Sequence, residues 1–157
     1  MTPTFSGRIQ TRIFLILVIG VPWTLIITPF LPGSSAASEL GLFEFAKKVY
    51  PVTFTALGVV LVFGVFLWEP IYHLLQQLRW ERDWPIMFFL LLLIPEAALA
   101  WFVLRALEPT GAANTTFATF AVHIATSWVL MWLFVVGPIR VILPRYRFRG
   151  GRLFGGW

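Results

Sequence analysis

The stretch PIMFFLLLLIPEAALAWFVL, residues 85–104, contains a single charged residue, Glu96. As a helix, roughly 20 apolar residues at ~1.5 Å per residue cross the ~30 Å hydrocarbon core of a bilayer. Three other stretches are similar in length and composition: Ile13–Leu31, Val49–Trp68 and Phe117–Leu143. One such stretch could be the buried helix of a soluble protein, but four in succession predict a membrane protein. We therefore expect an all-α fold, a bundle of four transmembrane helices at about residues 13–31, 49–68, 85–104 and 117–143, in one membrane domain covering residues 1–157.

The composition supports the same class of protein. The chain is 59% hydrophobic and 12% charged, whereas a soluble domain is usually about 45–50% apolar and about 25% charged. A chain of 157 residues can bury a normal core, so a larger interior does not explain the apolar excess. We therefore expect much of the apolar surface of the protein to contact lipid. The chain has no cysteine, which excludes disulfides, thiolate metal sites and thiol catalysis.

The basic residues are distributed unevenly between the two predicted ends of the bundle. The positive-inside rule counts Lys and Arg close to the ends of the spans. One end would carry nine of them: Arg8, Arg12, Arg79, Arg82, Arg140, Arg145, Arg147, Arg149 and Arg152. The other end would carry three: Lys47, Lys48 and Arg105. We therefore predict a multi-pass protein of the cytoplasmic (inner) membrane with both termini in the cytoplasm, and the excess of arginine over lysine fits a bacterial source.

The first predicted span has an alternative interpretation as a secretory signal peptide. Gly33–Ser38 is rich in small residues and could be a cleavage site. However, the preceding apolar run is longer than the roughly 7–15 residues of a typical signal-peptide core. We therefore prefer a membrane span.

Two of the connections carry helical patterns of their own. The first outer connection has apolar residues at helical spacing beside two lysines: Leu42, Phe43, Ala46 and Val49. The inner connection has a comparable apolar stripe: Ile71, Leu74, Leu75 and Leu78. Each pattern predicts a short amphipathic helix lying at the membrane interface. Trp68, Trp80 and Trp84 flank the inner one and would form an aromatic belt.

Glu96 and His123 are the candidates for chemistry within the membrane. They lie in neighbouring antiparallel spans at similar predicted depth, and ionisable residues in a span are functional candidates by default. A Glu–His pair could pass a proton. The alternative is structural: Glu96 would cap groups freed where Pro95, like Pro22, kinks its helix, and His123 would bond a hydroxyl such as that of Thr126 or Ser127. We prefer the structural alternative, because a proton conduit normally has more than one acidic station.

Other chemistry finds little support in the sequence. The two histidines, His73 and His123, lie far apart and lack the spacing of metal ligands, so no metal site and no cofactor is predicted. The chain has no Gly-x-Ser-x-Gly nucleophile motif and no glycine-rich phosphate loop between a strand and a helix. We therefore predict no catalytic residues.

The inner connection and the tail, residues 144–157, carry the predicted contact surfaces. The tail PRYRFRGGRLFGGW alternates arginine with aromatic residues. This pattern suits anionic lipid headgroups, at ~1 kcal/mol per basic residue, or another membrane protein subunit. Such tails can also bind single-stranded nucleic acid. Because this tail follows a membrane span, we prefer lipid or a protein subunit over nucleic acid as its partner. The candidate partner or lipid contacts are Gln76, Gln77, Arg79, Trp80, Asp83, Trp84, Arg145, Tyr146, Arg147, Phe148, Arg149, Arg152, Phe154 and Trp157.

These patterns favour one function over two others. We expect a non-catalytic subunit or scaffold of a larger membrane protein complex, which docks through the cytoplasmic inner connection and the tail. The alternative is a small proton- or ion-coupled transporter that uses Glu96 and His123. An intramembrane enzyme acting on lipid has the least support, because no acid, base and nucleophile converge.

Overall fold

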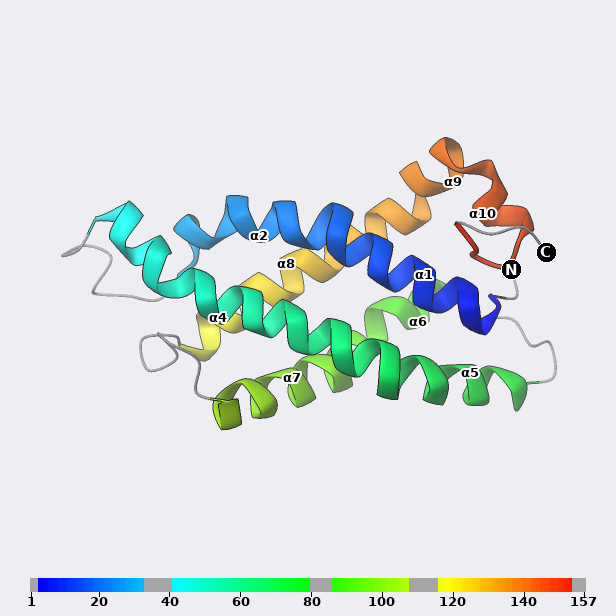
Figure 1. Ribbon diagram of the computed structural model, residues 1–157, viewed down its shortest axis with the longest axis horizontal. Coiled ribbons are helices and arrows are strands. Elements are labelled where there is room, and N and C mark those ends of the chain that lie inside the picture. The colour runs from blue at the N-terminus through cyan, green and yellow to red at the C-terminus, as the bar shows by residue number, and fades with distance from the viewer. Residues whose placement is uncertain (1–2, 33–40, 80–85, 108–115, 154–157) are drawn as a thin grey trace.

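The computed structural model describes residues 3–32, 41–79, 86–107 and 116–153, and these ranges are helical apart from turns and short connecting segments (Figure 1). The helices, in chain order, are α1 (Phe5–Leu15), a π-helical turn η1 (Ile16–Gly20), α2 (Val21–Ile27), a 3-10 turn η2 (Thr28–Phe30), α4 (Leu42–Phe63), a second π-helical turn η3 (Gly64–Trp68), α5 (Glu69–Gln77), α6 (Ile86–Leu91), α7 (Leu93–Leu107), α8 (Phe117–Val136), α9 (Pro138–Ile142) and α10 (Pro144–Phe148).

These elements join into four long helices, each long and apolar enough to cross a membrane. They cover Phe5–Phe30, Phe43–Gln77, Met87–Leu107 and Phe117–Ile142. The prediction of an all-helical chain with four such helices is therefore confirmed. The first long helix begins earlier than the expected residue 13, so two further turns, which contain Arg8 and Arg12, belong to it. The helix starts at Phe5 because the Thr4 side chain accepts a hydrogen bond from the Gly7 amide and caps it.

The second long helix corrects the prediction of two separate interfacial helices. Residues 42–49 and 69–77 are the two ends of one continuous helix of 35 residues, Phe43–Gln77. At ~1.5 Å per residue this helix is roughly 50 Å long. The apolar patterns at its ends were interpreted correctly as helical. Their separation from the span was wrong, because the helix continues through Pro51, Gly58 and Gly64, which lie between them.

Three prolines of the long helices, Pro22, Pro70 and Pro95, follow local changes in the helical turn, whereas Pro51 lies within the regular helix α4. A proline ring clashes with the carbonyl four residues earlier, and a wider π-turn relieves that clash. The π-turn Ile16–Gly20 precedes Pro22, and the π-turn Gly64–Trp68 precedes Pro70. Before Pro95, the helix is interrupted at Leu92, between α6 and α7. The expected distortions at Pro22 and Pro95 are therefore present.

The core lies along the axis between all four long helices. Its fully buried apolar side chains include Leu15 and Ile16 from the first helix, Ala56 from α4, Leu104 from α7 and Met131 from α8. Gly20 lies against the side chain of Leu57, and a Cβ added there would be 3.2 Å from Leu57 Cδ1. The first and second helices therefore approach closely at Gly20, where an added Cβ would make a tight contact with Leu57.

The described part of the C-terminal tail folds back onto the start of α1, next to the N-terminus (Figure 1). The Thr4 amide donates to the Gly150 carbonyl at 2.9 Å, and the Thr11 hydroxyl lies 3.0 Å from the Gly151 carbonyl. The Leu153 amide donates to Gln10 Oε1 at 2.9 Å. Gly150 and Gly151 have φ values of 58° and 82°, a conformation that glycine adopts without strain. The chain itself therefore holds this segment in place.

Candidate functional site

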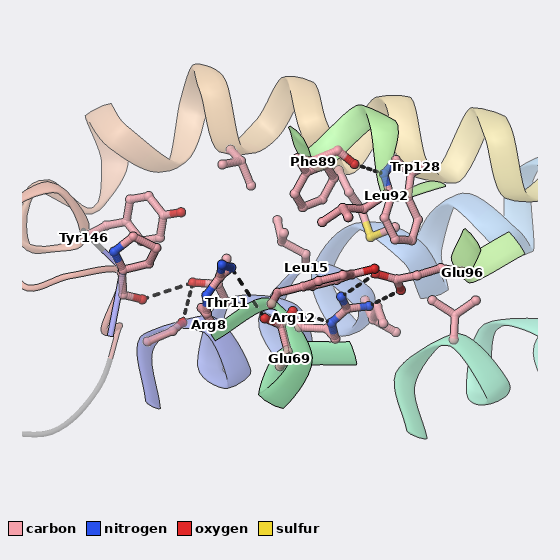
Figure 2. Close-up of a pocket in the computed structure, with 18 of the residues that line it drawn as sticks. Arg8, Thr11, Arg12, Leu15, Glu69, Phe89, Leu92, Glu96, Trp128 and Tyr146 are labelled. Atoms are coloured by element: carbon pink, nitrogen blue, oxygen red, sulfur yellow. Dashed lines mark hydrogen bonds and ion pairs between the residues drawn. The ribbon is translucent and has the colours of Figure 1, made fainter. Parts of the chain in front are cut away.

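A cluster of four charged side chains lies inside the bundle, and we refer to Arg8, Arg12, Glu69 and Glu96 as the charge cluster. Arg12 is at its centre: Nη1 and Nη2 donate to the two carboxylate oxygens of Glu96 at 2.6 and 2.8 Å, and Nε donates to Glu69 Oε1 at 2.7 Å (Figure 2). Arg8 Nη1 lies 3.7 Å from the other Glu69 oxygen. One guanidinium therefore links two carboxylates from different helices.

Three helices supply the charge cluster. Arg8 and Arg12 are one turn apart on α1, Glu69 begins α5, and Glu96 lies in the first turn of α7. Gly64 makes room for Arg12, since a Cβ at Gly64 would lie 2.5 Å from Arg12 Nη1. The ring of Trp128 on α8 has its centroid 6.0 Å from the Arg12 guanidinium carbon. The cluster therefore joins the first, second and third long helices and contacts the fourth.

The charge cluster is nearly inaccessible to solvent. The side chains of Arg8, Arg12, Glu69 and Glu96 are 7%, 10%, 8% and 1% exposed. A buried charge is tolerated when it is paired and hydrogen-bonded. The two arginines and two glutamates neutralise one another, and the planar guanidinium matches the Glu96 carboxylate in a bidentate pair. This geometry is that of a fixed electrostatic cross-link between helices.

A cavity of about 130 Å³ borders the charge cluster. One part of its lining is polar and includes Arg8, Arg140, Thr11 and Tyr146, with Tyr146 toward one end in Figure 2. Another part is apolar and is formed by Leu15, Ile16, Val60, Phe89, Leu92, Met131 and Val135. Tyr146 lies outside the long helices, and burial raises the pKa of its hydroxyl, so that it stays protonated and can donate a hydrogen bond.

The structure places the predicted polar pair in two separate groups. Glu96 is held by Arg12, whereas His123 Nε2 lies 2.9 Å from the Thr24 hydroxyl. That hydroxyl donates its proton to the Gly20 carbonyl at 2.8 Å, so the arrangement assigns the proton of His123 to Nε2. His123 thus bonds a hydroxyl, as the structural alternative expected, although the hydroxyl is on another helix. The Ser127 and Thr126 hydroxyls instead lie 2.7 and 3.2 Å from the His123 carbonyl.

His123 belongs to a strip of buried polar side chains near the other end of the bundle. Thr24, Thr28 and Thr53 continue from it, and each is at most 2% exposed. The Thr28 and Thr53 hydroxyls are 3.2 Å apart, and Thr28 also donates to the Thr24 carbonyl at 2.6 Å. The strip connects α8, the first long helix and α4 by hydrogen bonds between neutral groups.

The predicted contact residues of the inner connection have different environments. Gln76 is buried against the chain, whereas Gln77 is exposed and bonds His73 across one helical turn at 3.0 Å. The Arg79 guanidinium lies over the ring of Phe88, 5.4 Å from its centroid. Trp80, Asp83 and Trp84 lie outside the described residues. The large apolar side chains exposed on α5 are Leu74 and Leu75, and Leu78 is exposed just after its end.

The predicted contact residues of the tail also differ in their environments: some are buried and others are exposed. Tyr146 is buried and borders the cavity, Arg152 Nε donates to the Thr4 hydroxyl at 3.2 Å, and Phe148 and Arg149 are exposed. Phe154 and Trp157, together with the side chains of Arg145 and Arg147, lie outside the described part of the chain. The tail residues that contact α1 are therefore engaged within the chain.

Sequence reasoning missed the roles of Arg8, Arg12 and Glu69. The two arginines were counted only as flanking charges that set the membrane orientation. The signal that could have indicated the cluster is depth in the membrane. If the first helix starts at Phe5, Arg12, Glu69 and Glu96 lie at similar depths. Depth alone does not identify partners, because it leaves the rotation of each helix undetermined.

The fold and the charge cluster define a class of protein. It is an all-helical bundle of four helices of membrane-spanning length, in which buried ion pairs link the helices. No protein-family model, curated protein or solved structure matches this chain. In the described ranges, no group of three or more His, Asp or Glu residues could hold a metal ion.

Proposed function

We propose that the chain is a multi-pass integral membrane protein that serves as a non-catalytic subunit or scaffold of a larger membrane protein complex. The observation that carries this proposal is the state of the charge cluster. Both carboxylate oxygens of Glu96 accept hydrogen bonds from Arg12, which also binds Glu69. A catalytic acid or proton carrier must exchange its proton during turnover, whereas these carboxylates are committed to holding helices together.

The surface at the inner end of the second long helix supports a docking role. Leu74, Leu75 and Leu78 are 61%, 48% and 83% exposed. The helix that carries Leu74 and Leu75 and ends just before Leu78 is 35 residues long, although roughly 20 residues suffice to cross the hydrocarbon core. An exposed apolar stripe beyond that length suits contact with a helix of another membrane protein subunit.

Site-specific photo-crosslinking in the native membrane tests the subunit proposal. A photoreactive amino acid at Leu78 should give a discrete adduct with another membrane protein, identified by mass spectrometry. The same amino acid at Phe102, which is 71% exposed on α7, provides a matched control in a segment without this stripe and should give lipid adducts. If Leu78 and Phe102 both yield only lipid, or only a second copy of this chain, the subunit proposal is wrong.

A proton- or ion-coupled conduit is the second candidate, and one observation favours it. The buried polar strip from His123 through Thr24 and Thr28 to Thr53 lies near one end of the bundle, and the cavity that Glu96 borders lies nearer the other end. Buried polar groups therefore occur in both halves of the bundle. Flux of protons through liposomes containing only this chain, abolished by Glu96→Gln in a folded variant, would support a conduit. Equal leakage with and without the protein would exclude proton conduction.

A further inference from the structure

The lining of the cavity carries more positive than negative charge. Among the described residues that border it, Arg8, Arg12 and Arg140 are cationic, and Glu69 and Glu96 are anionic. Arg12 binds both glutamates and Arg8 lies against Glu69, so these four charges balance. Arg140 is then the surplus cation. A charge in a confined site of low dielectric constant is costly unless an anion neutralises it.

Hydrogen-bond donors gather around that surplus charge. Arg140 Nε is buried and has no hydrogen-bond partner within the described ranges. Tyr146 is buried and borders the same cavity as Arg140 and Arg8, to which it brings a hydroxyl donor. Guanidinium and hydroxyl donors of this kind suit a phosphate oxygen. A cation is a poor occupant, because Arg12 engages both Glu96 oxygens and Arg8 stands against Glu69.

The remaining lining favours an amphiphile over a free ion. The volume of about 130 Å³ far exceeds the roughly 10–15 Å³ that one water requires. Apolar side chains from all four long helices, including Leu15, Val60, Leu92 and Met131, form the rest of the lining. In Figure 2, Tyr146 and Arg8 lie on one side of Leu15, and Leu92 and Trp128 lie on the other. The cavity thus offers a cationic region and a hydrocarbon region to one ligand.

We propose that this cavity binds a singly charged phosphate group, carried by an anionic phospholipid whose phosphodiester meets Arg140 and Tyr146 while an acyl chain follows the apolar lining. Arginine-containing pockets between helices are a common means of holding lipid headgroups. The proposal rests on the membrane location of the chain and is independent of the subunit role, so crosslinking at Leu78 and lipid binding give separate readouts.

Thermal unfolding of the full-length protein in a neutral detergent tests this assignment. Tryptophan fluorescence reports unfolding while short-chain phosphatidylglycerol, the matching phosphatidylcholine or inorganic phosphate is titrated. Phosphatidylglycerol should raise the midpoint by roughly 5 °C near saturation, and zwitterionic phosphatidylcholine should have little effect. Arg140→Gln should abolish the shift. Arg149→Gln is the matched control, because Arg149 lies in the same region but is exposed, and it should retain the full shift.

Each alternative result has a definite meaning. An equal shift with inorganic phosphate would retain the phosphate site but assign it to a soluble ligand. An equal phosphatidylglycerol shift in wild type and Arg140→Gln, or equal losses in Arg140→Gln and Arg149→Gln, would overturn the site in favour of general surface attraction. If Arg140→Gln does not fold, native mass spectrometry of the wild type decides. One retained phosphatidylglycerol and no retained phosphatidylcholine supports the proposal, and equal retention of both lipids overturns it.

Discussion

Arg12 shows how a single side chain can join helices that are distant in the sequence. Its three nitrogens donate to Glu69 and Glu96, which lie in the first turns of α5 and α7. Flexible lysine could not replace this arrangement, because the planar guanidinium presents its donors in a fixed fork. The sequence revealed Glu96 as a costly charge within a span, but it could not reveal Arg12 as its partner. Arginines near span ends are common for topological reasons, and only the packing of α1 distinguishes this one.

Removing only one member of the charge cluster should be more harmful than removing two. Arg12→Met would leave two buried carboxylates with one remaining cation, which should cost about 3–5 kcal/mol of stability. The double variant Arg12→Met with Glu96→Gln leaves Arg8 beside Glu69 as a balanced pair and should recover most of that loss. The midpoint of thermal unfolding in detergent measures both effects. Additive losses in the double variant would show that Arg12 and Glu96 are not energetically coupled.

At the scale of the helices, the apolar runs of the sequence and the helices of the structure end at different residues. The apolar runs correctly predicted four helices, because burial in lipid requires long uninterrupted apolar stretches. They did not predict that the second helix continues to Gln77, since a helix persists wherever its backbone hydrogen bonds are not broken. The prolines at 22 and 95 were recognisable as sites of distortion. The π-turn before Pro70 was not, although it aligns Gly64 and Glu69 with Arg12.

Two glycines on the second long helix provide a matched test of this alignment. A Cβ at Gly64 would lie 2.5 Å from Arg12 Nη1 and 2.6 Å from its Cδ, whereas a Cβ at Gly58 meets nothing within 4 Å. Arg12 is fixed by its hydrogen bonds and cannot move aside freely, so Gly64→Ala should cost about 1–3 kcal/mol. Gly58→Ala should be neutral or stabilising by about 0.5–1 kcal/mol. Equal unfolding midpoints for the two variants would contradict the packing of Arg12 over Gly64.

At the scale of the whole molecule, the two ends of the bundle differ in charge. The start of α1, the end of α5 and the described part of the tail lie at one end in Figure 1. Arg8, Arg140, Arg149 and Arg152 belong to that end, whereas Lys47, Lys48 and Arg105 lie near the start of α4 or the end of α7. Some of these arginines lie inside the bundle, where they border the cavity or belong to the charge cluster. The uneven distribution of arginine therefore contributes to packing within the bundle, in addition to its use in predicting the membrane orientation.

We predict that the end bearing both termini faces the cytoplasm, because basic residues near span ends are retained on that side. The chain has no cysteine, so single cysteines can report the orientation without background. Ser6→Cys and Glu44→Cys introduce exposed thiols at opposite ends of the bundle. In intact cells, a membrane-impermeant maleimide should label Glu44→Cys and leave Ser6→Cys unlabelled, and permeabilisation should allow both to react. The reverse pattern would invert the topology and place the tail, Arg140 and the proposed phosphate site on the outer face.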